Sequence, residues 1–270
     1  MLNNFTINGD KYSYEDVGSG DVVVLFHGFT GSRKTWSELI IFLKREYRVI
    51  SIDLPGHGYT ETNEHKSVKG FCTDMYHLFE ELNINKVHLL GYSMGGRTAL
   101  SFALYYPEMV SSLILESASP GIADPKLKRE RRIADAKLAA SIVNFGVIDF
   151  VNQWEKIDLF KSQLNLPANI KRIIREERLN QSKEGLSASL LYMGTGIQPS
   201  WWDKLNTVSI PVTLIVGELD EKFVLINEQM KELFKNVNLY TIKEAGHCVH
   251  LEKTNEFNEQ VRISLRKYSE

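Results

Sequence analysis

The sequence predicts an α/β fold in which a mostly parallel, doubly wound β-sheet is interrupted by a helical insertion. Two observations carry this prediction. Short, continuous apolar runs such as residues 22–26 (VVVLF) alternate with helix-like segments, which is typical of a parallel sheet covered on both faces. This alternation stops between residues 121 and 205, where the chain is polar and helical in period, and it resumes at residues 212–217 (VTLIVG).

The first part of the chain is expected to build most of the sheet. Residues 5–16 alternate apolar and polar side chains and run into a Gly-Ser-Gly turn, so we expect an opening β-hairpin. Further strands are expected at residues 22–26, 48–54, 87–90 and 110–115, and helices at residues 35–44, 68–82 and from a glycine-rich turn to about residue 106. Because helices connect these strands, the strands should lie parallel.

The helical insertion is predicted to separate the core domain into two stretches of sequence. Residues 1–120 and 206–270 should form the core, and residues 121–205 should form a helical lid over the carboxyl ends of the strands, where ligands bind in such sheets. A peripheral helical decoration is the alternative. After the strand at residues 212–217, we expect a helix at residues 225–234, a strand at residues 239–242 and a closing helix at residues 256–267.

The composition argues against a nucleic-acid-binding, membrane-spanning or disulfide-stabilised protein. A chain of 270 residues suits one α/β domain, and its net charge of −2 gives no reason to expect nucleic acid or an anionic membrane as a partner. It has no run of about 18 apolar residues and no basic, then apolar leader, so we expect a cytoplasmic protein without stable membrane insertion. Cys72 and Cys248 are too few for a disulfide framework and form no metal-binding motif.

The most informative motif is GYSMG at residues 91–95, which lies between an apolar strand-like run and a helix-like segment. A G-x-S-x-G sequence in that position is typical of a nucleophile elbow, a strained turn that lifts the serine hydroxyl above the sheet. Gly91 and Gly95 are required because a side chain at either position would collide with the neighbouring strand or helix. Ser93 is therefore the candidate reactive serine, and an incidental serine in a glycine-rich turn is the alternative.

A serine of this kind needs a histidine to take its proton and a carboxylate to hold that histidine. On a strand–elbow–helix scaffold they follow the serine in the order acid, then histidine. Asp220 lies just after the strand at residues 212–217, with Glu218 and Glu221 as adjacent alternatives, and His247 follows the last predicted strand. Asp220 and His247 are therefore the candidate partners of Ser93.

An oxyanion hole requires two backbone N–H groups. We expect one from Met94, at the start of the elbow helix, and the other from Phe29, where the chain turns after residues 22–26. His27 should hold that turn, and His57 should make hydrogen bonds within the turn at residues 55–58. His250 is expected to pack on the lid side or at the surface.

Together these residues resemble the α/β-hydrolase superfamily over nearly the whole chain. The shared motifs are residues 27–28, the DLPGHG segment at residues 53–58, the elbow, the Asp220 turn and the AGH segment at residues 245–247. The resemblance implies the fold and a Ser-His-Asp triad. It says little about the reaction, because this fold hosts esterases, C–C hydrolases, dehalogenases, lyases and hormone receptors.

Arg97 narrows the chemistry. It lies four positions after Ser93, so one helical turn should place it beneath or beside the serine. A buried guanidinium requires an anionic partner, which is either an internal carboxylate or a carboxylate of the substrate that the fork binds with two hydrogen bonds. The insertion supplies further cations, of which one or two facing the cleft would suit a polycarboxylate: Lys126, Lys128, Arg129, Arg131, Arg132 and Lys137.

Within the superfamily, the chain resembles the menaquinone-pathway synthases that form 2-succinyl-6-hydroxy-2,4-cyclohexadiene-1-carboxylate (SHCHC) by eliminating pyruvate. The segments that carry this resemblance are residues 91–97, 116–121, the arginine-rich run to residue 131, residue 154, residues 194–200 and residues 220–223. The resemblance implies that Arg97 and Arg131 hold carboxylates and that Tyr92, Trp154 and Lys222 line the pocket. Arg129 and Arg132 are neighbouring alternatives to Arg131, and no metal or organic cofactor is implied.

The implied reaction uses Ser93, deprotonated by His247, as a base that removes a ring proton so that pyruvate leaves. The expected partner is a small polycarboxylate substrate, and the protein is expected to be a monomer or a weak homodimer. A carboxylesterase or C–C bond hydrolase would use the same triad and is the principal alternative. A non-catalytic ligand receptor on the same fold is a more remote one.

Overall fold

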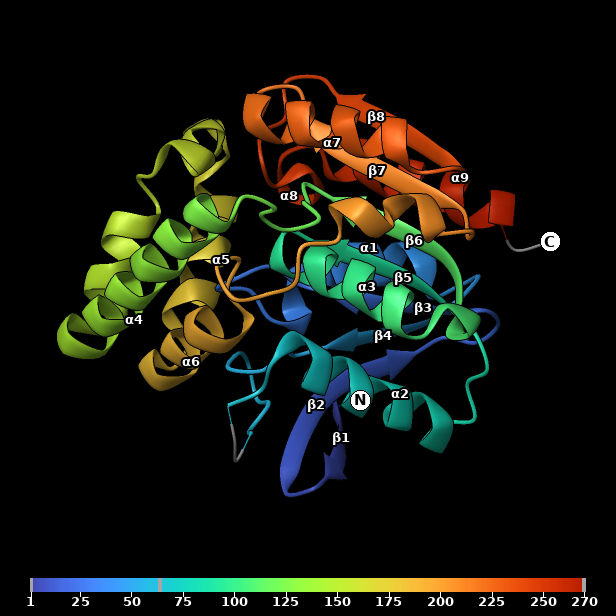
Figure 1. Cartoon of the computed structure of the whole chain (residues 1–270), viewed down its shortest axis with the longest axis horizontal. Coiled ribbons are helices and arrows are strands. Elements are labelled where there is room, and N and C mark those ends of the chain that lie inside the picture. Colours follow the sequence, from blue (N-terminus) through green and yellow to red (C-terminus); the bar gives the residue numbers. More distant parts are fainter. Residues whose placement is uncertain (1, 63–64, 269–270) are drawn as a thin grey trace.

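The computed structural model of the protein describes residues 2–62 and 65–268, and it confirms the expected fold class. Within these residues, eight strands form one sheet in the order β1-β2-β4-β3-β5-β6-β7-β8 (Figure 1). The strands are β1 (Leu2–Ile7), β2 (Asp10–Val17), β3 (Val22–Phe26), β4 (Arg48–Ile52), β5 (Val87–Tyr92), β6 (Val110–Glu116), β7 (Val212–Gly217) and β8 (Val237–Ile242).

The sheet opens with the expected hairpin and then becomes parallel. Asn8 and Gly9 join β1 to β2 with φ angles of 51° and 85°, the left-handed pair that a two-residue hairpin turn requires. Strand β2 pairs antiparallel with β4, and every later pair in the sheet is parallel. The carboxyl ends of β3, β5, β6, β7 and β8 therefore point to one edge of the sheet.

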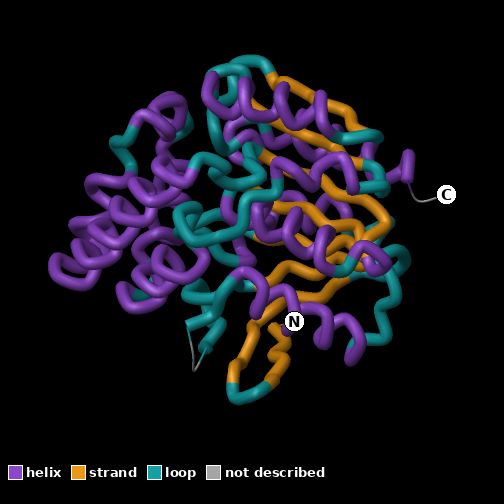
Figure 2. The backbone as a smooth tube through the Cα atoms, in the orientation of Figure 1, coloured by secondary structure: helices purple, strands orange, loops and turns teal. Residues whose placement is uncertain are grey.

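Helices cover both faces of the sheet (Figures 1 and 2). They are α1 (Ser37–Leu43), α2 (Val68–Glu81), α3 (Met94–Tyr105), α7 (Glu221–Leu233), α8 (Val249–Glu252) and α9 (Thr254–Tyr268). Alternate residues of β3 show the two layers. Val24 and Phe26 pack in the cluster that contains α2 and α3, whereas Val23 and Leu25 pack in the cluster that contains α1 and α9.

The chain between β6 and β7 is helical throughout its regular elements, and these helices stand beside the sheet in Figure 1. This helical segment contains α4 (Pro125–Trp154), η3 (Asp158–Asn165), α5 (Ala168–Leu179), α6 (Lys183–Met193) and η4 (Trp202–Thr207). Gly146 breaks α4 with a φ of 85°. The segment has its own small core, against which Phe29 from the end of β3 packs. It thus lies over the carboxyl edge of the sheet.

Two local differences from the sequence expectations concern short helices. The helix expected from residue 35 begins as a 3-10 turn, η1 (Arg33–Trp36), and α8 was not expected at all. Among the described residues, no helix is both long and apolar enough to cross a membrane.

Candidate active site

Ser93 lies in the strained turn that the elbow motif predicts. It follows β5 and precedes α3 with φ 50° and ψ −106°, a conformation that costs a non-glycine residue about 1–3 kcal/mol. A Cβ atom on Gly91 would lie 2.4 Å from the Gly95 carbonyl oxygen, and one on Gly95 would lie 2.1 Å from that of Phe26. The backbones are therefore close enough to hold Ser93 in this turn only because both flanking residues are glycines.

Three strand ends bring Ser93, His247 and Asp220 together. Ser93 Oγ lies 3.1 Å from His247 Nε2, and Asp220 Oδ2 lies 2.6 Å from His247 Nδ1. The alternative carboxylate Glu218 instead accepts a hydrogen bond from the Glu244 N–H. The imidazole thus bridges a hydroxyl and a carboxylate, which is the arrangement that lets a histidine accept a proton from serine.

Phe29 and Met94, whose backbone N–H groups were expected to form the oxyanion hole, line the same cavity as Ser93. Met94 is the first residue of α3, and the first N–H groups of a helix have no partner within it. Phe29 is the second residue of a turn that the Gly31 N–H closes onto the Gly28 carbonyl at 3.1 Å. Thr30, the third residue of this turn, has a φ of 71°, which is strained for a β-branched residue. We call residues 28–31 the Phe29 turn.

Two buried histidines hold the Phe29 turn. His27 Nδ1 donates to the Gly28 carbonyl at 2.7 Å, and its Nε2 accepts from the Leu54 N–H at 3.0 Å. His57 Nε2 accepts from the Thr30 N–H at 3.2 Å. Burial lowers the pKa of His27 to about 4 and that of His57 to about 3, so both rings are neutral and keep the acceptor nitrogens that these bonds require.

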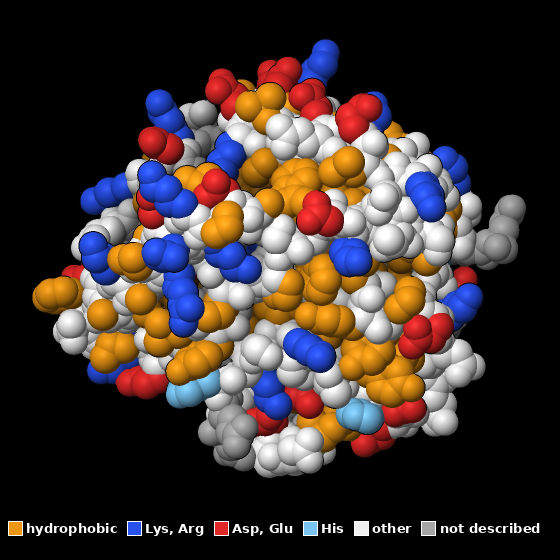
Figure 3. Space-filling model, in the orientation of Figure 1, with side chains coloured by type: hydrophobic (Ala, Val, Ile, Leu, Met, Phe, Trp, Pro, Cys, Tyr) orange, Lys and Arg blue, Asp and Glu red, His pale blue; other side chains and the backbone are white. Residues whose placement is uncertain are grey.

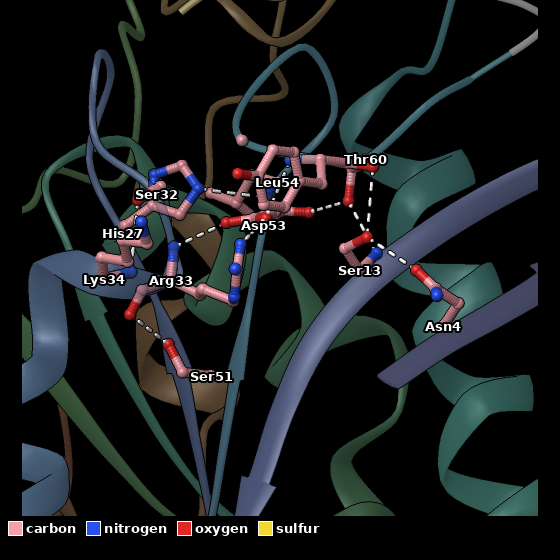
Figure 4. A network of polar contacts seen from close by, with 12 residues as sticks. Asn4, Ser13, His27, Ser32, Arg33, Lys34, Ser51, Asp53, Leu54 and Thr60 are labelled. Carbon is pink, nitrogen blue, oxygen red and sulfur yellow. Dashed lines mark hydrogen bonds and ion pairs between the residues drawn. The ribbon is translucent and has the colours of Figure 1, made fainter. Parts of the chain in front are cut away.

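A buried ion pair connects this region to the next turn (Figure 4). Arg33 Nη1 lies 2.6 Å from Asp53 Oδ2, and the Arg33 N–H donates to Asp53 Oδ1 at 2.7 Å. The Thr60 hydroxyl donates to the Asp53 carbonyl and accepts from the Ser13 N–H. This network fastens the chain after β3 to the chain after β4 and to β2.

A cavity of about 440 Å³ opens at the carboxyl edge of the sheet beneath the helical segment. Its walls include nine of the ten residues that the sequence assigned to the site: Phe29, Tyr92, Ser93, Met94, Arg97, Arg131, Trp154, Lys222 and His247. Asp220 lies behind His247 rather than in the wall. The structure therefore brings the expected residues together around one cavity.

Arg97 is partly buried beside Ser93, and among the described residues it forms no ion pair with a carboxylate. Its Nη1 donates to the Gln198 side-chain oxygen and, at 3.3 Å, to the Met193 carbonyl. Burial, together with the charge of Arg131, lowers the pKa of Arg97 to about 9. The direct hydrogen bonds of the guanidinium thus go to neutral groups, and the Asp135 carboxylate only partly offsets the lowering of its pKa. An anionic ligand in the cavity would further stabilise the charged form of Arg97.

Arg131 lines the same cavity from α4 but does have an internal partner. Its Nε donates to Asp135 Oδ1 at 2.7 Å, one helical turn further on. The i, i+4 spacing of an arginine and an aspartate in the sequence could have revealed this pair. Gln198, which holds Arg97, had no comparable signal because 101 residues separate the two.

The remaining predicted wall residues differ in what they offer the cavity. The Tyr92 hydroxyl already forms a hydrogen bond with Cys248 Sγ at 2.6 Å. The Trp154 ring packs edge-on against Phe29 at 5.6 Å, and its indole N–H is buried without a partner in the described part of the chain. The Lys222 side chain is exposed at the start of α7.

Several wall residues were not anticipated, and most of them are apolar: Asp135, Leu138, Phe160, Ser189, Phe223 and Ile226. They come from α4, η3, α6 and α7, so no single periodic pattern in the sequence marks them. Their presence makes the cavity apolar between its charged groups.

His250 is buried and does not lie at the surface, which was one of the two positions expected; it shares a cavity with residues of α5, on the side of the helical segment. It is only 5% exposed, and its Nδ1 lies 2.8 Å from both carboxylate oxygens of Glu116. The rings of Trp36 and Tyr92 pack on it at 4.9 Å and 4.8 Å. The short helix α8 turns this part of the chain inward, so His250 pairs with a carboxylate at the end of β6.

Comparison with known proteins agrees with this architecture. The α/β hydrolase fold model matches residues 21–254. A Bacillus subtilis (strain 168) protein provisionally named 2-succinyl-6-hydroxy-2,4-cyclohexadiene-1-carboxylate synthase is 42% identical over 96% of both chains. A Salmonella paratyphi A protein with that synthase name is 29% identical over 85% of this chain and 88% of its own.

Solved structures also share this fold. MenH from S. aureus superposes with a TM-score of 0.92 at 35% identity, covering 96% of this chain and 99% of its own. A thermophilic esterase from Thermogutta terrifontis, solved with malate bound, reaches a TM-score of 0.87 at 26% identity and covers both chains completely. On these similarities, the chain belongs to the 2-succinyl-6-hydroxy-2,4-cyclohexadiene-1-carboxylate synthase family of α/β-hydrolase fold proteins.

Proposed function

We propose that this protein is a carbon–oxygen lyase that eliminates pyruvate from 2-succinyl-5-enolpyruvyl-6-hydroxy-3-cyclohexene-1-carboxylate to give SHCHC. The observation that carries the proposal is Arg97, which lies in the same cavity wall as Ser93 and His247 and, among the described residues, makes no direct ion pair with a carboxylate. The family relationship points to the same reaction, because the related proteins bear the name of this synthase.

The cavity suits an anionic organic substrate. Arg97 supplies a guanidinium fork for a substrate carboxylate, and Arg131 and Lys222 add positive charge at the wall. Trp154, Phe29 and Phe160 offer apolar surface for the carbon ring. Basic side chains also gather over the helical segment in Figure 3, where they would attract a polycarboxylate toward the opening.

The proposed chemistry is a proton abstraction followed by loss of the enolpyruvyl group. His247 takes the Ser93 hydroxyl proton at Nε2, while Asp220 at Nδ1 stabilises the resulting imidazolium. Ser93 Oγ then removes a ring proton, the electron pair moves into the ring, and the bond between the ring carbon and the enolpyruvyl oxygen breaks. The leaving enolate takes the proton held by His247 and becomes pyruvate, Ser93 keeps the ring proton as its hydroxyl proton, and no acyl-enzyme is formed.

The N–H groups of Phe29 and Met94 would bind the negative charge that develops during this step. The helical segment would act as a lid, since it roofs the cavity and contributes Arg131 and Trp154 to its wall. Excluding water from the cavity strengthens each of these electrostatic interactions.

The direct test is to incubate the protein with the enolpyruvyl precursor and to measure pyruvate release alongside the new ring absorbance. The proposal requires both products in equal amounts. The same preparation should be given p-nitrophenyl acetate, because an esterase shares the fold and superposes over the whole chain. Efficient ester turnover through a trapped acyl-Ser93, without pyruvate from the precursor, would establish the hydrolase function instead.

A further inference from the structure

We propose that Gln181, a residue of the helical segment remote from the reacting atoms, is a positioning residue that holds the Phe29 turn in its N–H-presenting conformation. This inference rests on the proposed function, in which the Phe29 N–H binds developing charge. Gln181 lies at the junction of α5 and α6 and is 6% exposed. It does not line the active-site cavity.

The Gln181 amide joins the Phe29 turn to the turn at residues 55–58. Its Nε2 donates to the Gly31 carbonyl at 3.1 Å, and its Oε1 accepts from the Gly58 N–H at 3.0 Å. A further bond runs from Nε2 to the Glu177 carbonyl at 3.1 Å, within its own helix end. Two carbonyls face the nitrogen and one N–H faces the oxygen, so a flipped amide would lose all three bonds.

The Phe29 turn needs external support because it is strained. Thr30 has a φ of 71°, and such a conformation persists in a β-branched residue only where the surroundings over-determine it. Two supports come from the chain segments that follow β3 and β4: His27 bonds to Gly28, and His57 bonds to Thr30. Gln181 adds the support at Gly31, the last residue of the turn, and it comes from the helical segment.

Further contacts join the α5–α6 junction to the residues after the Phe29 turn and to the turn at residues 55–58. Glu177 Oε1 accepts hydrogen bonds from the Ser32 hydroxyl at 2.6 Å and the Thr35 hydroxyl at 2.9 Å. A Cβ atom on Gly185 would lie 2.3 Å from the Gly56 carbonyl oxygen, so the start of α6 touches the backbone of the turn at residues 55–58. The position of the helical segment is thereby transmitted to the Phe29 N–H through the Gln181 amide.

The test replaces Gln181 by Met, which preserves length and removes all three hydrogen bonds. The matched control is Gln153→Met on the exposed surface of α4. Removing an oxyanion-hole donor outright costs about 10²–10³ in kcat, so a donor that is only loosened should cost less, about tenfold, with KM unchanged. Hydrogen exchange of the peptide covering residues 26–33 should become faster in Gln181→Met and stay the same in Gln153→Met.

A second readout does not depend on the natural substrate. Diethyl p-nitrophenyl phosphate phosphorylates an activated serine: the Ser93 Oγ–P bond forms, the bond to p-nitrophenolate breaks, and His247 takes the hydroxyl proton. This rate should fall together with kcat in Gln181→Met. If the wild-type protein releases no pyruvate, the proposed function fails, while the exchange and phosphorylation rates still test the role of Gln181.

Two outcomes would overturn the inference. If Gln181→Met lowers Tm but leaves both kcat and the phosphorylation rate at the wild-type level, the amide only stabilises the fold. If KM rises while exchange of residues 26–33 is unchanged, Gln181 acts on substrate capture and not on the Phe29 turn.

Discussion

Individual residues of the site are held in states that they would not adopt in solution. Ser93 has a positive φ, Arg97 has a pKa lowered to about 9, and His57 has a pKa lowered to about 3. The surrounding fold stabilises each of these unfavourable states, and such groups concentrate where chemistry occurs. The effects of single substitutions at these positions on activity and on stability can therefore be measured separately.

We expect Ser93→Ala, His247→Ala and Asp220→Asn each to lower the rate of pyruvate release by about 10²–10⁴-fold, because each removes part of one proton-transfer unit. Their effects should not add, so a double variant should be about as slow as the slower single one. Steady-state kinetics and Tm would be measured together, with the exposed Ser19→Ala as control. Near wild-type turnover by Ser93→Ala would refute the role of the serine.

Arg97→Lys should preserve the charge but lose the guanidinium fork. A charge-assisted hydrogen bond contributes about 1.5–3 kcal/mol, so kcat/KM for the precursor should fall roughly ten- to a hundred-fold. The matched control is Arg129→Lys on the exposed face of α4. A large loss of Tm with unchanged kcat/KM would show instead that Arg97 serves the structure through Gln198 and Met193.

His57 should make the stability of the protein depend on pH. The unfolded residue titrates near its ordinary pKa of 6.5, whereas the folded one titrates near 3, so between these values the unfolded state binds one more proton. The free energy of unfolding should therefore fall as the pH is lowered from about 6.5. In His57→Gln, this slope at pH 5 should be shallower by about 1.4 kcal/mol per pH unit, as urea titrations would measure. An unchanged slope would show that His57 is already charged in the folded protein.

The connection between β5 and α3 leaves no space for a side chain at Gly91 or Gly95. The close approach of Gly95 to the Phe26 and His27 carbonyls brings the start of α3 against the end of β3. The same approach places the start of α3 beside Phe26 and His27, the residues just before the Phe29 turn. Helix α2 presents the opposite case, since a Cβ atom on Gly70 would meet only the flexible Lys66 side chain and the Ser67 hydroxyl.

Gly95→Ala and Gly70→Ala should accordingly have opposite effects on stability. Gly95→Ala places a methyl group 2.1 Å from a backbone oxygen, so it should lower Tm and abolish turnover. Gly70→Ala should raise the free energy of unfolding by up to about 1 kcal/mol, because alanine favours the helix. Thermal unfolding and pyruvate release would be followed for both. A fully active, equally stable Gly95→Ala protein would contradict the elbow geometry.

The molecule as a whole carries its charge unevenly. Its net charge is only −2, yet basic side chains gather over the helical segment that covers the cavity (Figure 3). The segment contributes Arg131 directly to the cavity wall. A positive field over this segment would attract anions before they bind.

Salt should therefore weaken capture of the polycarboxylate substrate. Exposed charges are screened beyond about 8 Å at physiological ionic strength, so kcat/KM for the precursor should fall as salt is raised. A neutral ester should show little dependence over the same range. Equal salt dependence for both substrates would indicate that the basic surface does not act in substrate capture.

Much of this protein could be predicted from its sequence because the relevant signals are local. Apolar strand runs, helical periodicity and the glycines around Ser93 each act through neighbouring residues. They indicated the fold class and the succession of strands and helices along the chain. The chain order of Ser93, Asp220 and His247 also pointed to the residues that the structure brings together. Local patterns of this kind depend on little else in the fold.

What only the tertiary structure decided depends on contacts between distant segments. The pairing of His250 with Glu116 spans 134 residues, and the Gln181 bond to the Gly31 carbonyl spans 150. The partner of Arg97 was likewise open in the sequence, since either an internal carboxylate or a ligand could satisfy it. Folding determined that Gln198 and Met193 hold it, because burial requires a hydrogen-bond partner and the packing of the helical segment on the sheet sets which partners are within reach.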